Sequence, residues 1–507
     1  MIGIVVSRAD SASEHVGERL RAIGDWTRHE DATRPDAEGG GIYYRTEGFE
    51  LREFEGLHID LSNPAAAFGE SENGSTVAFL VFVSRHSGET GRLLTAHVTG
   101  NFGPAEYGGE PRTLSRAAPG AVSRVVDALA TNAPDGYDMG IECTHHGPTD
   151  TAVPSLFVEV GSDEPQWSDP AAAGAVARAV LDLRGTGPNL VGGDGRPRHV
   201  VGFGGGHYAP RFTRIVRDSE WTVGHVAADW GLGEMGAPEA NRDVIAAAFE
   251  RSNADYAVID GNRPALAETV EALGHRVVSE TWIRVVGDRP LALVETLEER
   301  VAPVAEGLRF GAVVPDGFEG GSGDDGPRDA VVVREFPAEL LARAQGINGA
   351  DADSDGNAVD ADGDDNAVDA DGDDNADDAV GDAARAVVEA NAVAFETEQA
   401  GTRAVGRVAF AAAATAPGYD DLVADLASVL ETAYDEVTIE RTPGDDPDAV
   451  VARETAFDPE RAAIRGVPEG PAFGTLADGE AVEINGETVR PAEVSRETEE
   501  RFPIDPA

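Results

Sequence analysis

Two adjacent histidines stand between carboxylates in the segment ECTHHGPTD, residues 142–150. Neutral imidazole is the commonest metal ligand in proteins, and Asp or Glu completes many catalytic zinc sites. In a strand, His145 and His146 would point to opposite faces. In a loop before the following Gly-Pro pair, both rings could converge on one ion, or each could serve a different ion. The segment therefore predicts a metal site.

Three carboxylates lie near these histidines in the sequence: Glu142, Asp150 and Glu159. Each could ligate a metal, orient a metal ligand, or take a proton from an attacking water. Cys143 is the only cysteine of the chain, and we favour a small core residue or a metal ligand over a nucleophile. A single cysteine excludes an intrachain disulfide framework and fits a reducing compartment.

Histidines of the same kind recur in five short, polar, glycine-rich segments. One isolated histidine in such a loop is more often a hydrogen-bonded loop residue than a ligand. Six of them favour a site, although the spacing in HHGPTD is not a general zinc signature. These segments are SRHSG with His86, TAHVTGNFG with His97, ECTHHGPTD with His145 and His146, GFGGGHYAPR with His207, and VGHVAADWG with His225.

The triple glycine before His207 lets the backbone approach a ligand closely and can present N–H groups to phosphate, or it can simply form a turn. Neither the GxGxxG spacing nor a P-loop lysine is present, which excludes nucleotide binding of those two types. Arginines beside the histidine segments could pair with a phosphate or a carboxylate. The predicted phosphate-binding residues are Arg85, Gly204, Gly205, Gly206 and Arg211.

The elements that position these residues form an alternating pattern over residues 1–285. Short apolar runs alternate with helical periodicity, which predicts an α/β fold with a mostly parallel sheet flanked by helices. In such sheets, sites form beyond the carboxyl ends of strands, where SRHSG and GGGHYAPR are expected. The predicted strands are Ile2–Ser7, Val77–Ser84, Ser155–Val160, Val200–Phe203 and Tyr256–Asp260, and the clearest helices cover residues 171–184 and 241–252.

The rest of the chain predicts a smaller α+β region in two parts, 286–345 and 385–507, with a helix over 419–434 and a hairpin at Asn485-Gly486. Between them, residues 346–384 form an acidic insert that we expect to be disordered, since 351–382 holds 14 Asp and no basic residue. Its DADSDG run resembles the start of a calcium loop, but Asp362 stands where such a loop needs Glu.

The charge of the chain is strongly negative: 93 Asp and Glu oppose 40 basic residues, all of them Arg, which gives a net charge of −53. Such an excess repels itself in dilute buffer, whereas at about 1 M salt the Debye length falls to roughly 3 Å. We therefore predict adaptation to molar salt. The acidity would then report the solvent, and it no longer excludes a nucleic-acid ligand.

The N-terminal run lacks the basic start and the long apolar stretch of a signal peptide, and no run of 18 apolar residues is present. We therefore expect a cytoplasmic protein with no membrane partner. We also expect it to act as a monomer and to have no DNA partner.

Taken in order, SRHSG, AHVTGNFG, ECTHHGPTDTAVPSLFVEVGS and GFGGGHYAP followed by GHV make residues 1–285 resemble the archaeal and plant type of D-aminoacyl-tRNA deacylase. The resemblance implies hydrolysis of the ester between a D-amino acid and the 3′ end of tRNA, with zinc as cofactor, and we expect two ions per chain. It also implies a fold similar to peptidyl-tRNA hydrolases and nucleoside phosphorylases.

The resemblance makes site residues of the matching histidines. We assign Glu142, Asp150, Glu159, His86 and His97 to catalysis and His145, His146 and His207 to the metal, and we expect Arg85, Arg211 and Arg214 to supply phosphate contacts. The region after 285 is extra relative to compact members. Its stretch VPEGPAFGTLADGEAVEINGETVRPAEV is similar to tRNA 3′-processing endonucleases, but the HxHxDH ligand run of those nucleases is missing.

Two alternatives remain from the sequence. One is a zinc hydrolase acting on small esters or amides, or on peptidyl-tRNA. The other is a tRNA-binding protein without activity, whose histidines do not bind metal.

Overall fold

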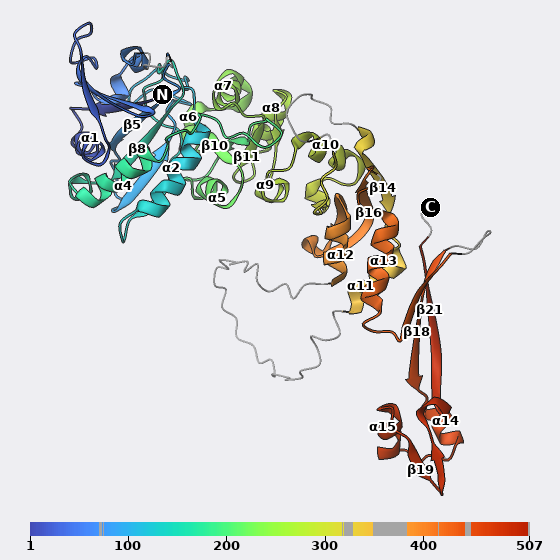
Figure 1. The fold of residues 1–507 in the computed structure, drawn as a ribbon. Helices are drawn as coiled ribbons and strands as arrows, with labels where there is room; N and C mark the ends of the chain where they lie inside the picture. Colours follow the sequence, from blue (N-terminus) through green and yellow to red (C-terminus); the bar gives the residue numbers. More distant parts are fainter. Residues whose placement is uncertain are drawn as a thin grey trace, which may run out of the picture. The chain divides into compact units, whose positions relative to one another are not determined.

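The computed structural model describes residues 1–69, 74, 76–316, 318, 328–347, 383–413, 415–441 and 448–504. The chain divides into two compact units, unit 1 (Met1–Leu291) and unit 2 (Ala292–Ala507) (Figure 1). The predicted calcium loop and the acidic stretch 351–382 lie outside the described residues. The four-segment division of the chain stays a prediction.

Unit 1 is built on an eight-stranded mixed sheet with the order β2-β3-β4-β1-β5-β8-β6-β7. Its central strands β4, β1, β5 and β8 run parallel, while β6 runs antiparallel to β8 and parallel to β7. The predicted mostly parallel sheet is therefore confirmed, although β6 and β7 run opposite to β8, and β3 runs opposite to β4. The strands are β1 (Ile2–Ser7), β2 (Thr27–Asp31), β3 (Gly41–Thr46), β4 (Phe49–Phe54), β5 (Phe79–Arg85), β6 (Leu93–His97), β7 (Asp138–Ile141) and β8 (Ser155–Gly161).

The three central strands β1, β5 and β8 are almost completely buried, as expected of strands covered on both faces. Helices α1 and α4 pack against β5 and β8, respectively. Asp10 caps α1 by accepting from the amides of Ala12 and Ser13, and Asp169 caps α4 in the same way. The helices associated with this sheet are α1 (Ser11–Ile23), α2 (Pro119–Asn132), α3 (Glu164–Trp167) and α4 (Pro170–Leu181).

A second, four-stranded sheet of unit 1 is entirely parallel, with the order β10-β9-β11-β12. Its core includes Phe203, Ile245 and Phe249, the residues that the apolar pattern predicts on β9 and α7. The strands are β9 (His199–Phe203), β10 (Thr222–Ala227), β11 (Tyr256–Ile259) and β12 (Arg276–Val277), and the helices are α5 (Pro210–Asp218), α6 (Asp229–Met235), α7 (Arg242–Ser252), α8 (Pro264–Ala272) and α9 (Glu280–Val286).

Unit 2 is α+β, as predicted, with a four-stranded sheet β13-β15-β16-β14, a three-stranded sheet β17-β18-β21 and the hairpin β19-β20. The hairpin turns at Asn485 and Gly486, both with positive φ. Its strands are β13 (Arg309–Phe310), β14 (Val331–Glu335), β15 (Ala394–Glu398), β16 (Arg403–Ala411), β17 (Glu436–Glu440), β18 (Ala449–Phe457), β19 (Val482–Ile484), β20 (Glu487–Val489) and β21 (Ser495–Pro503). Its helices are α11 (Ala338–Ile347), α12 (Ala383–Asn391), α13 (Tyr419–Leu430), α14 (Pro459–Ile464) and α15 (Pro471–Ala477), and α10 (Leu291–Arg300) begins at the division between the units.

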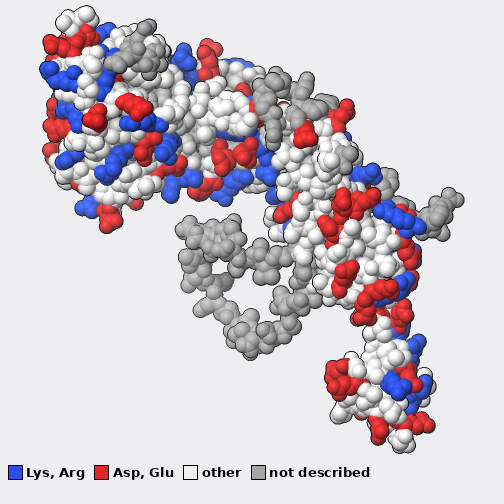
Figure 2. All heavy atoms as spheres, viewed as in Figure 1, with Lys and Arg blue, Asp and Glu red and all other residues white. Residues whose placement is uncertain are grey.

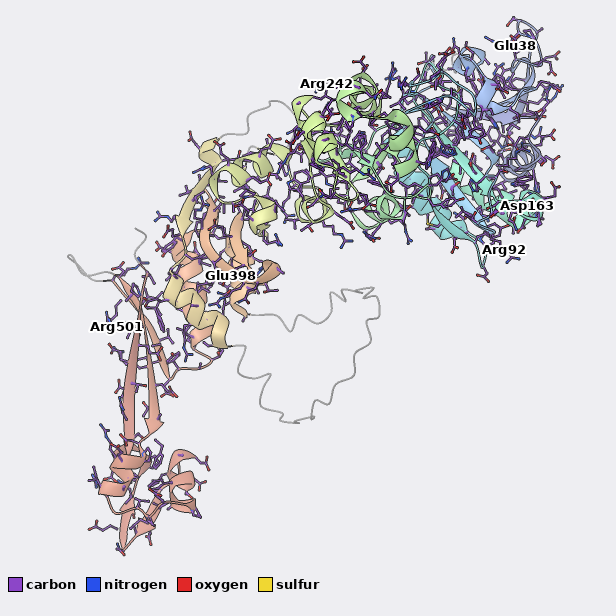
Figure 3. The ribbon with its side chains drawn as sticks, turned by 180° about the vertical axis from the view of Figure 1, so that it is seen from behind. Glu38, Arg92, Asp163, Arg242, Glu398 and Arg501 are labelled. Atoms are coloured by element: carbon purple, nitrogen blue, oxygen red, sulfur yellow. The ribbon has the colours of Figure 1, made fainter. Side chains whose placement is uncertain are left out.

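Charged side chains of both signs cover the visible surface of each unit, as the composition demands (Figure 2). Figure 3 labels several that project from the surface, including Arg92 and Asp163 of unit 1 and Arg501 on β21. Within the described part of the chain, no helix is long and apolar enough to cross a membrane.

Candidate active site

One face of the large sheet supplies two of the predicted site residues, Glu159 and His97. Glu159 of β8 is paired in register with Ser84 of β5 and Thr95 of β6, and His97 is paired with Phe157. Because paired strand residues share a face and alternate residues return to it, Glu159 and His97 point to the same side. The His97 ring stacks on Phe157, with ring centroids 5.2 Å apart.

The loop after β7 brings in His145 and His146, and it is held in place from several directions. The amide of Thr144 donates to the carbonyl of Val226 on β10 (2.7 Å), and the amide of Cys143 donates to the carbonyl of His207 (2.8 Å). His146 adopts φ 49°, a left-handed conformation that ends the alternation of a strand. As a result the two neighbouring rings lie together, with centroids 4.3 Å apart.

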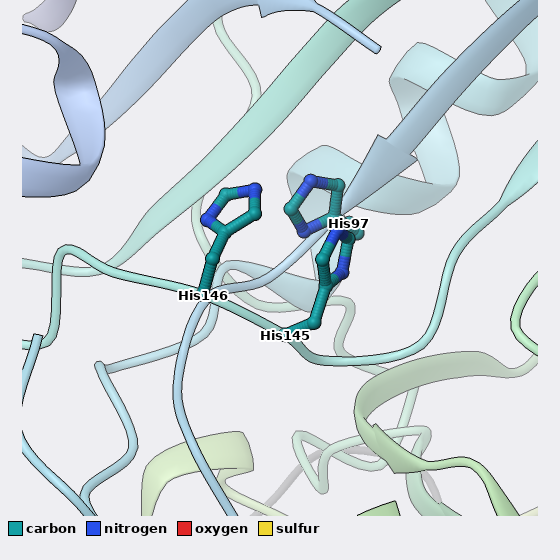
Figure 4. A group of neighbouring side chains, drawn as sticks. All are labelled: His97, His145 and His146. Atoms are coloured by element: carbon teal, nitrogen blue, oxygen red, sulfur yellow. The ribbon is translucent and has the colours of Figure 1, made fainter. Parts of the chain in front are cut away.

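His97, His145 and His146 form a trio whose ligating atoms all lie within 4.8 Å of one another (Figure 4). The Nδ1–H of each ring donates to a backbone carbonyl: His97 to Val98 (3.1 Å), His145 to Cys143 (2.8 Å) and His146 to Gly147 (2.6 Å). A carbonyl can only accept, so these bonds fix the tautomer with the lone pair on Nε2. His97 Nε2 is buried without a hydrogen-bond partner among the described residues.

That arrangement fits a metal ion. Ligating histidines usually donate their other ring nitrogen to a carbonyl or a carboxylate, which fixes the ring orientation. Three imidazoles that each offer a ring nitrogen within 4.8 Å of the others match the protein ligands of a catalytic zinc site. Without an ion, contact with Glu159, whose Oε1 is 3.6 Å from His97 Nε2, outweighs burial and raises the pKa of His97. The trio therefore has the donor atoms that the sequence predicted for zinc, and it includes His97, which we had assigned to catalysis.

Beside the trio lies a second buried group made of His86, Glu142 and Glu159. His86 Nδ1 is 3.1 Å from Glu142 Oε1 and 3.6 Å from Glu159 Oε2. The hydroxyl of Ser84 donates to Glu159 Oε1 (2.6 Å). On its other side, Glu142 Oε2 is 2.7 Å from Nε2 of His207, whose Nδ1 lies 3.6 Å from Cys143 Sγ. Glu142 thus connects the loops that carry His86 and His207.

Burial and neighbouring charges set the protonation of these groups. Burial, with the neighbouring His97 and His146 rings, holds the pKa of His145 well below its ordinary value. Burial and His97 lower the pKa of His146 to about 4. Burial also acts to lower the pKa of His86, but its contacts with Glu142 and Glu159 outweigh burial and raise this pKa to about 10. The imidazoles of His145 and His146 therefore stay neutral near pH 7, the state that binds metal.

The pKa values of the two glutamates respond in the opposite sense. Burial acts to raise the pKa of Glu142, but contacts with His207 and His86 hold it well below its usual range. The pKa of Glu159 is lowered as well, because contacts with His86 and His97 outweigh its burial. Both carboxylates are therefore ionised, and the charges they carry are matched by neighbouring imidazolium groups.

Two cavities open beside this histidine cluster, and both are bordered by Tyr107, His145, His146 and His207. The first, here called the aromatic cavity, has a volume of about 290 Å³ and is also lined by Phe102, Glu106, Trp230 and Glu234. The second, here called the arginine cavity, has a volume of about 490 Å³ and is also lined by Leu57, Ile59, Arg85, Phe157 and Glu159.

The remaining predicted residues occupy less central places. Asp150 is exposed and accepts from Ser62 (3.1 Å), outside the metal-ligand groups found among the described residues. The Arg211 guanidinium pairs with Asp260 (3.0 Å), and Arg214 pairs with Glu280 (2.7 Å). The role of Asp150 in catalysis and the roles of Arg211 and Arg214 in phosphate binding stay predictions.

The triple glycine turns the chain sharply after β9. Gly204 has φ 100°, and a Cβ there would lie 2.4 Å from the carbonyl oxygen of Asp260. Its own amide donates to the carbonyl of Ala227 (2.8 Å). The glycine at this position is thus required by close packing, and the turn presents His207 to Glu142. Phosphate binding by Gly204, Gly205 and Gly206 stays a prediction.

His225 has a supporting position. Its Nε2–H donates to the carbonyl of Ser115 (2.9 Å), and its Nδ1 lies 3.1 Å from the hydroxyl of Thr144. It is fully buried on β10 and borders neither cavity. His225 therefore holds the loop that carries His145.

Three kinds of side chain near the site were not predicted from the sequence. They are the aromatic residues Tyr107 and Trp230, the hydroxyl of Ser84, and the carboxylates Glu106 and Glu234. Ser84 is the first residue of the SRHSG segment, so its place at the strand end was a usable signal. Tyr107 and Trp230 stand in glycine-containing stretches without periodicity, and their role depends on tertiary contacts alone.

Comparison with known proteins shows the family of the chain. A family model described as D-aminoacyl-tRNA deacylase matches residues 73–278, which include every member of the histidine cluster. Relatives named D-aminoacyl-tRNA deacylase come from Halorubrum lacusprofundi (63% identical, covering 100% of this chain and 97% of the relative) and Natronomonas pharaonis (49%; 99% and 100%). A third, from Methanococcoides burtonii, is 30% identical and covers 98% of this chain and 95% of the relative.

Among solved structures, a crystal structure of a conserved protein of unknown function is 28% identical, with a TM-score of 0.48, and covers 56% of this chain and 96% of that chain. The three sequence relatives extend through unit 2 as well as unit 1, so the second unit is shared with them. With full-length identity of up to 63% to these relatives, the chain belongs to the D-aminoacyl-tRNA deacylase family.

Proposed function

We propose that this chain hydrolyses the ester bond between a D-amino acid and the 3′ end of tRNA, using zinc held by His97, His145 and His146. The observation that carries the chemistry is the trio of imidazoles, whose Nδ1–H groups are all bound to carbonyls and each of which offers a ring nitrogen within 4.8 Å of the others. Bound there, zinc lowers the pKa of water and polarises a carbonyl, which supplies the nucleophile and the oxyanion stabilisation of ester hydrolysis.

The two buried glutamates have different tasks in this proposal. Glu159 borders the arginine cavity, so its carboxylate can take the proton of the attacking water. Glu142 borders neither cavity and contacts His86 and His207, so it positions those two rings. His86, which also borders the arginine cavity, can give a proton to the departing ribose oxygen.

A second zinc ion imposes a condition on the ligands. Of the two further groups that could hold an ion, the one made of Cys143, His145 and His207 shares His145 with the trio, whereas His86, Glu142 and Glu159 share no residue with it. His145 has one nitrogen free, because its Nδ1–H is bound to the carbonyl of Cys143. Two ions could not both use it, so a second ion at Cys143 and His207 needs Glu142, whose Oε2 is 2.7 Å from His207 Nε2.

The test is turnover of paired D-Tyr-tRNA and L-Tyr-tRNA by the full-length chain in about 2 M KCl, where exposed charges are screened. We expect release of D-tyrosine to be far faster than release of L-tyrosine, and a chelator to abolish it until zinc is returned. Equal rates on the two substrates would refute the proposed stereospecificity. Full activity after chelation, with no zinc found by elemental analysis, would refute the metal.

A further inference from the structure

Two cavities adjoin the site, and this constrains how an ester can bind there. The aromatic and arginine cavities share Tyr107, His145, His146 and His207, so both adjoin the histidine cluster. An ester carbonyl carries two substituents, an acyl group on one side and an alcohol group on the other. A carbonyl placed beside the cluster can therefore direct one substituent into each cavity.

We infer that the aminoacyl group enters the aromatic cavity and that the terminal adenosine of the tRNA enters the arginine cavity. This inference rests on the proposed function and adds the assignment of each substrate half to its own pocket. Size agrees with the assignment, because the cavities measure about 290 and 490 Å³ and a nucleoside is the larger half.

Charge in the aromatic cavity favours an ammonium group. Glu106 and Glu234 are exposed at its wall, and neither forms an ion pair with another residue that the structure describes. The free α-amino group of an aminoacyl ester is cationic when protonated and can pair with these carboxylates. Trp230, 45% exposed, and Tyr107, 67% exposed, offer ring faces that attract a cation or pack against a side chain. A phosphate would be repelled there.

The arginine cavity carries charges of both signs, with Arg85 beside Asp10 and Glu159. Its carboxylates are already engaged: Asp10 accepts from the amides of Ala12, Ser13 and Arg85, and Glu159 accepts from Ser84. Arg85 is its one guanidinium among the described lining residues, and it lies over the Trp167 ring at 5.3 Å. A guanidinium in this position can bind the phosphate that precedes the terminal nucleoside.

The walls of the arginine cavity also suit a base. Leu57, Ile59 and Phe157 supply apolar and aromatic surface against which an adenine can pack. Stacking and apolar packing persist when salt screens charge, whereas phosphate contacts weaken steeply with salt. In a chain expected to work in molar salt, such a pocket retains nucleoside affinity with a single arginine.

This placement puts stereochemical selection in the aromatic cavity. When the carbonyl is beside the histidines and the ribose is in the arginine cavity, two Cα substituents remain, the ammonium and the side chain. Exchanging them, as the L-enantiomer does, moves the ammonium away from Glu106 and Glu234. We therefore expect these carboxylates to contribute to the rejection of one enantiomer.

The experiment measures binding of the two substrate halves separately, in about 2 M KCl, with full-length protein. The probes are 5′-AMP and D-tyrosinamide, followed by calorimetry and ligand-observed NMR. Arg85→Ala should weaken AMP by at least about tenfold and leave D-tyrosinamide unchanged, since a hydrogen bond to a charged group is lost. Glu234→Gln and Trp230→Ala should do the reverse.

Matched controls are Arg124→Ala and Glu18→Gln, exposed residues that line neither cavity. The reversed pattern, or loss of both probes in every variant, would overturn the assignment, as would a failure of the wild type to bind either probe. Wild-type turnover of D-Tyr-tRNA is measured alongside. Its absence would refute the proposed function itself, whereas turnover with the wrong binding pattern would refute the cavity assignment alone. The ratio of D to L turnover should fall in Glu234→Gln.

Discussion

The two units carry their charge in different ways. Unit 1 holds all 11 histidines and opposes 42 Asp and Glu with 25 Arg, whereas unit 2 has no histidine and opposes 51 with 15. In unit 1, charged groups such as Glu142 and Glu159 are buried among imidazoles. In unit 2, an exposed cluster on β18 surrounds Arg453 with four carboxylates, Glu436, Glu440, Glu497 and Glu499, at 3.0 to 3.8 Å.

The comparison distinguishes buried charges that take part in the chemistry of the site from exposed charges that interact with solvent and salt. Burying an ion costs several kcal/mol unless partners repay it, so buried carboxylates such as Glu142 and Glu159 need close cationic or hydrogen-bonding partners. Exposed pairs contribute little, and salt screens them further. The acidity of the chain as a whole therefore does not indicate its ligand. The two buried glutamates, Glu142 and Glu159, do indicate a functional site.

The largest effect is expected from His145→Ala, which removes one ligand of the trio. Loss of even a supporting contact to a metal ligand typically costs about 10–100-fold, so loss of a ligand should reduce deacylation by more than about 100-fold. Zinc content, measured by elemental analysis, should fall in parallel. The matched control is His29→Ala, on β2 and stacked on Tyr43, which should keep both. Unchanged zinc and turnover in His145→Ala would exclude the trio as the metal site.

Glu159→Gln should separate chemistry from metal binding. Without a carboxylate to take the proton, kcat should fall by about 100-fold or more, while zinc stays bound and KM changes little. Glu142→Gln should instead disturb both His86 and His207, and so change the pH profile as well as the rate. A Glu159→Gln enzyme that loses its zinc would show that this carboxylate is a ligand and not a base.

Much of this architecture could be predicted from the sequence, for a physical reason. Strands β1, β5 and β8 are buried on both faces, so they are continuous apolar runs that any reader can find. The polar, glycine-rich loops after β5 and β9 are equally visible. The reversal of β6 was not predictable, because it depends on which strand β6 pairs with, and that is decided by tertiary packing.

The site shows the same limit in finer detail. His146 and His225 stand in similar sequence surroundings, yet His146 joins the trio and His225 is bound to Ser115 and Thr144. Trp230 carries no sequence signal at all, since its place beside His207 depends on the position of α6. Sequence thus identifies the residue types that can do chemistry, and the packing between the two sheets selects among them.

Acid should destabilise unit 1 through His225. Burial lowers its pKa in the folded chain to about 4, below the ordinary 6.5. Because the folded value is depressed, the neutral ring contributes full stability above pH 6.5, and that contribution is lost as the pH falls toward 4. The loss should reach about 3 kcal/mol.

All five Trp lie in unit 1, so Trp fluorescence during urea unfolding follows this unit. In His225→Gln, the stability of unit 1 should vary less between pH 7 and 4 than in the wild type, and an unchanged variation would contradict this account.

The smallest effect is expected at the exposed cluster of unit 2, and it sharpens the comparison of the units. In about 2 M KCl, Arg453→Ala should move the thermal midpoint by less than about 2 °C, because exposed pairs contribute little and are screened. At about 0.3 M KCl the same change should cost more, since it leaves the four carboxylates close together with Arg501, which pairs with Glu440 and Glu499, as the remaining cation in this cluster of the described residues. In unit 1, Arg52 is buried and pairs with the fully buried Glu50 (2.6 Å), so Arg52→Ala should cost about 3–5 kcal/mol at both salt concentrations. Circular dichroism melts of both variants across a KCl series give the answer. An Arg453→Ala effect that is as large in 2 M KCl as at low salt would mean that this surface cluster is a structural element, and the distinction between buried functional charge and exposed solvent-facing charge would fail for unit 2.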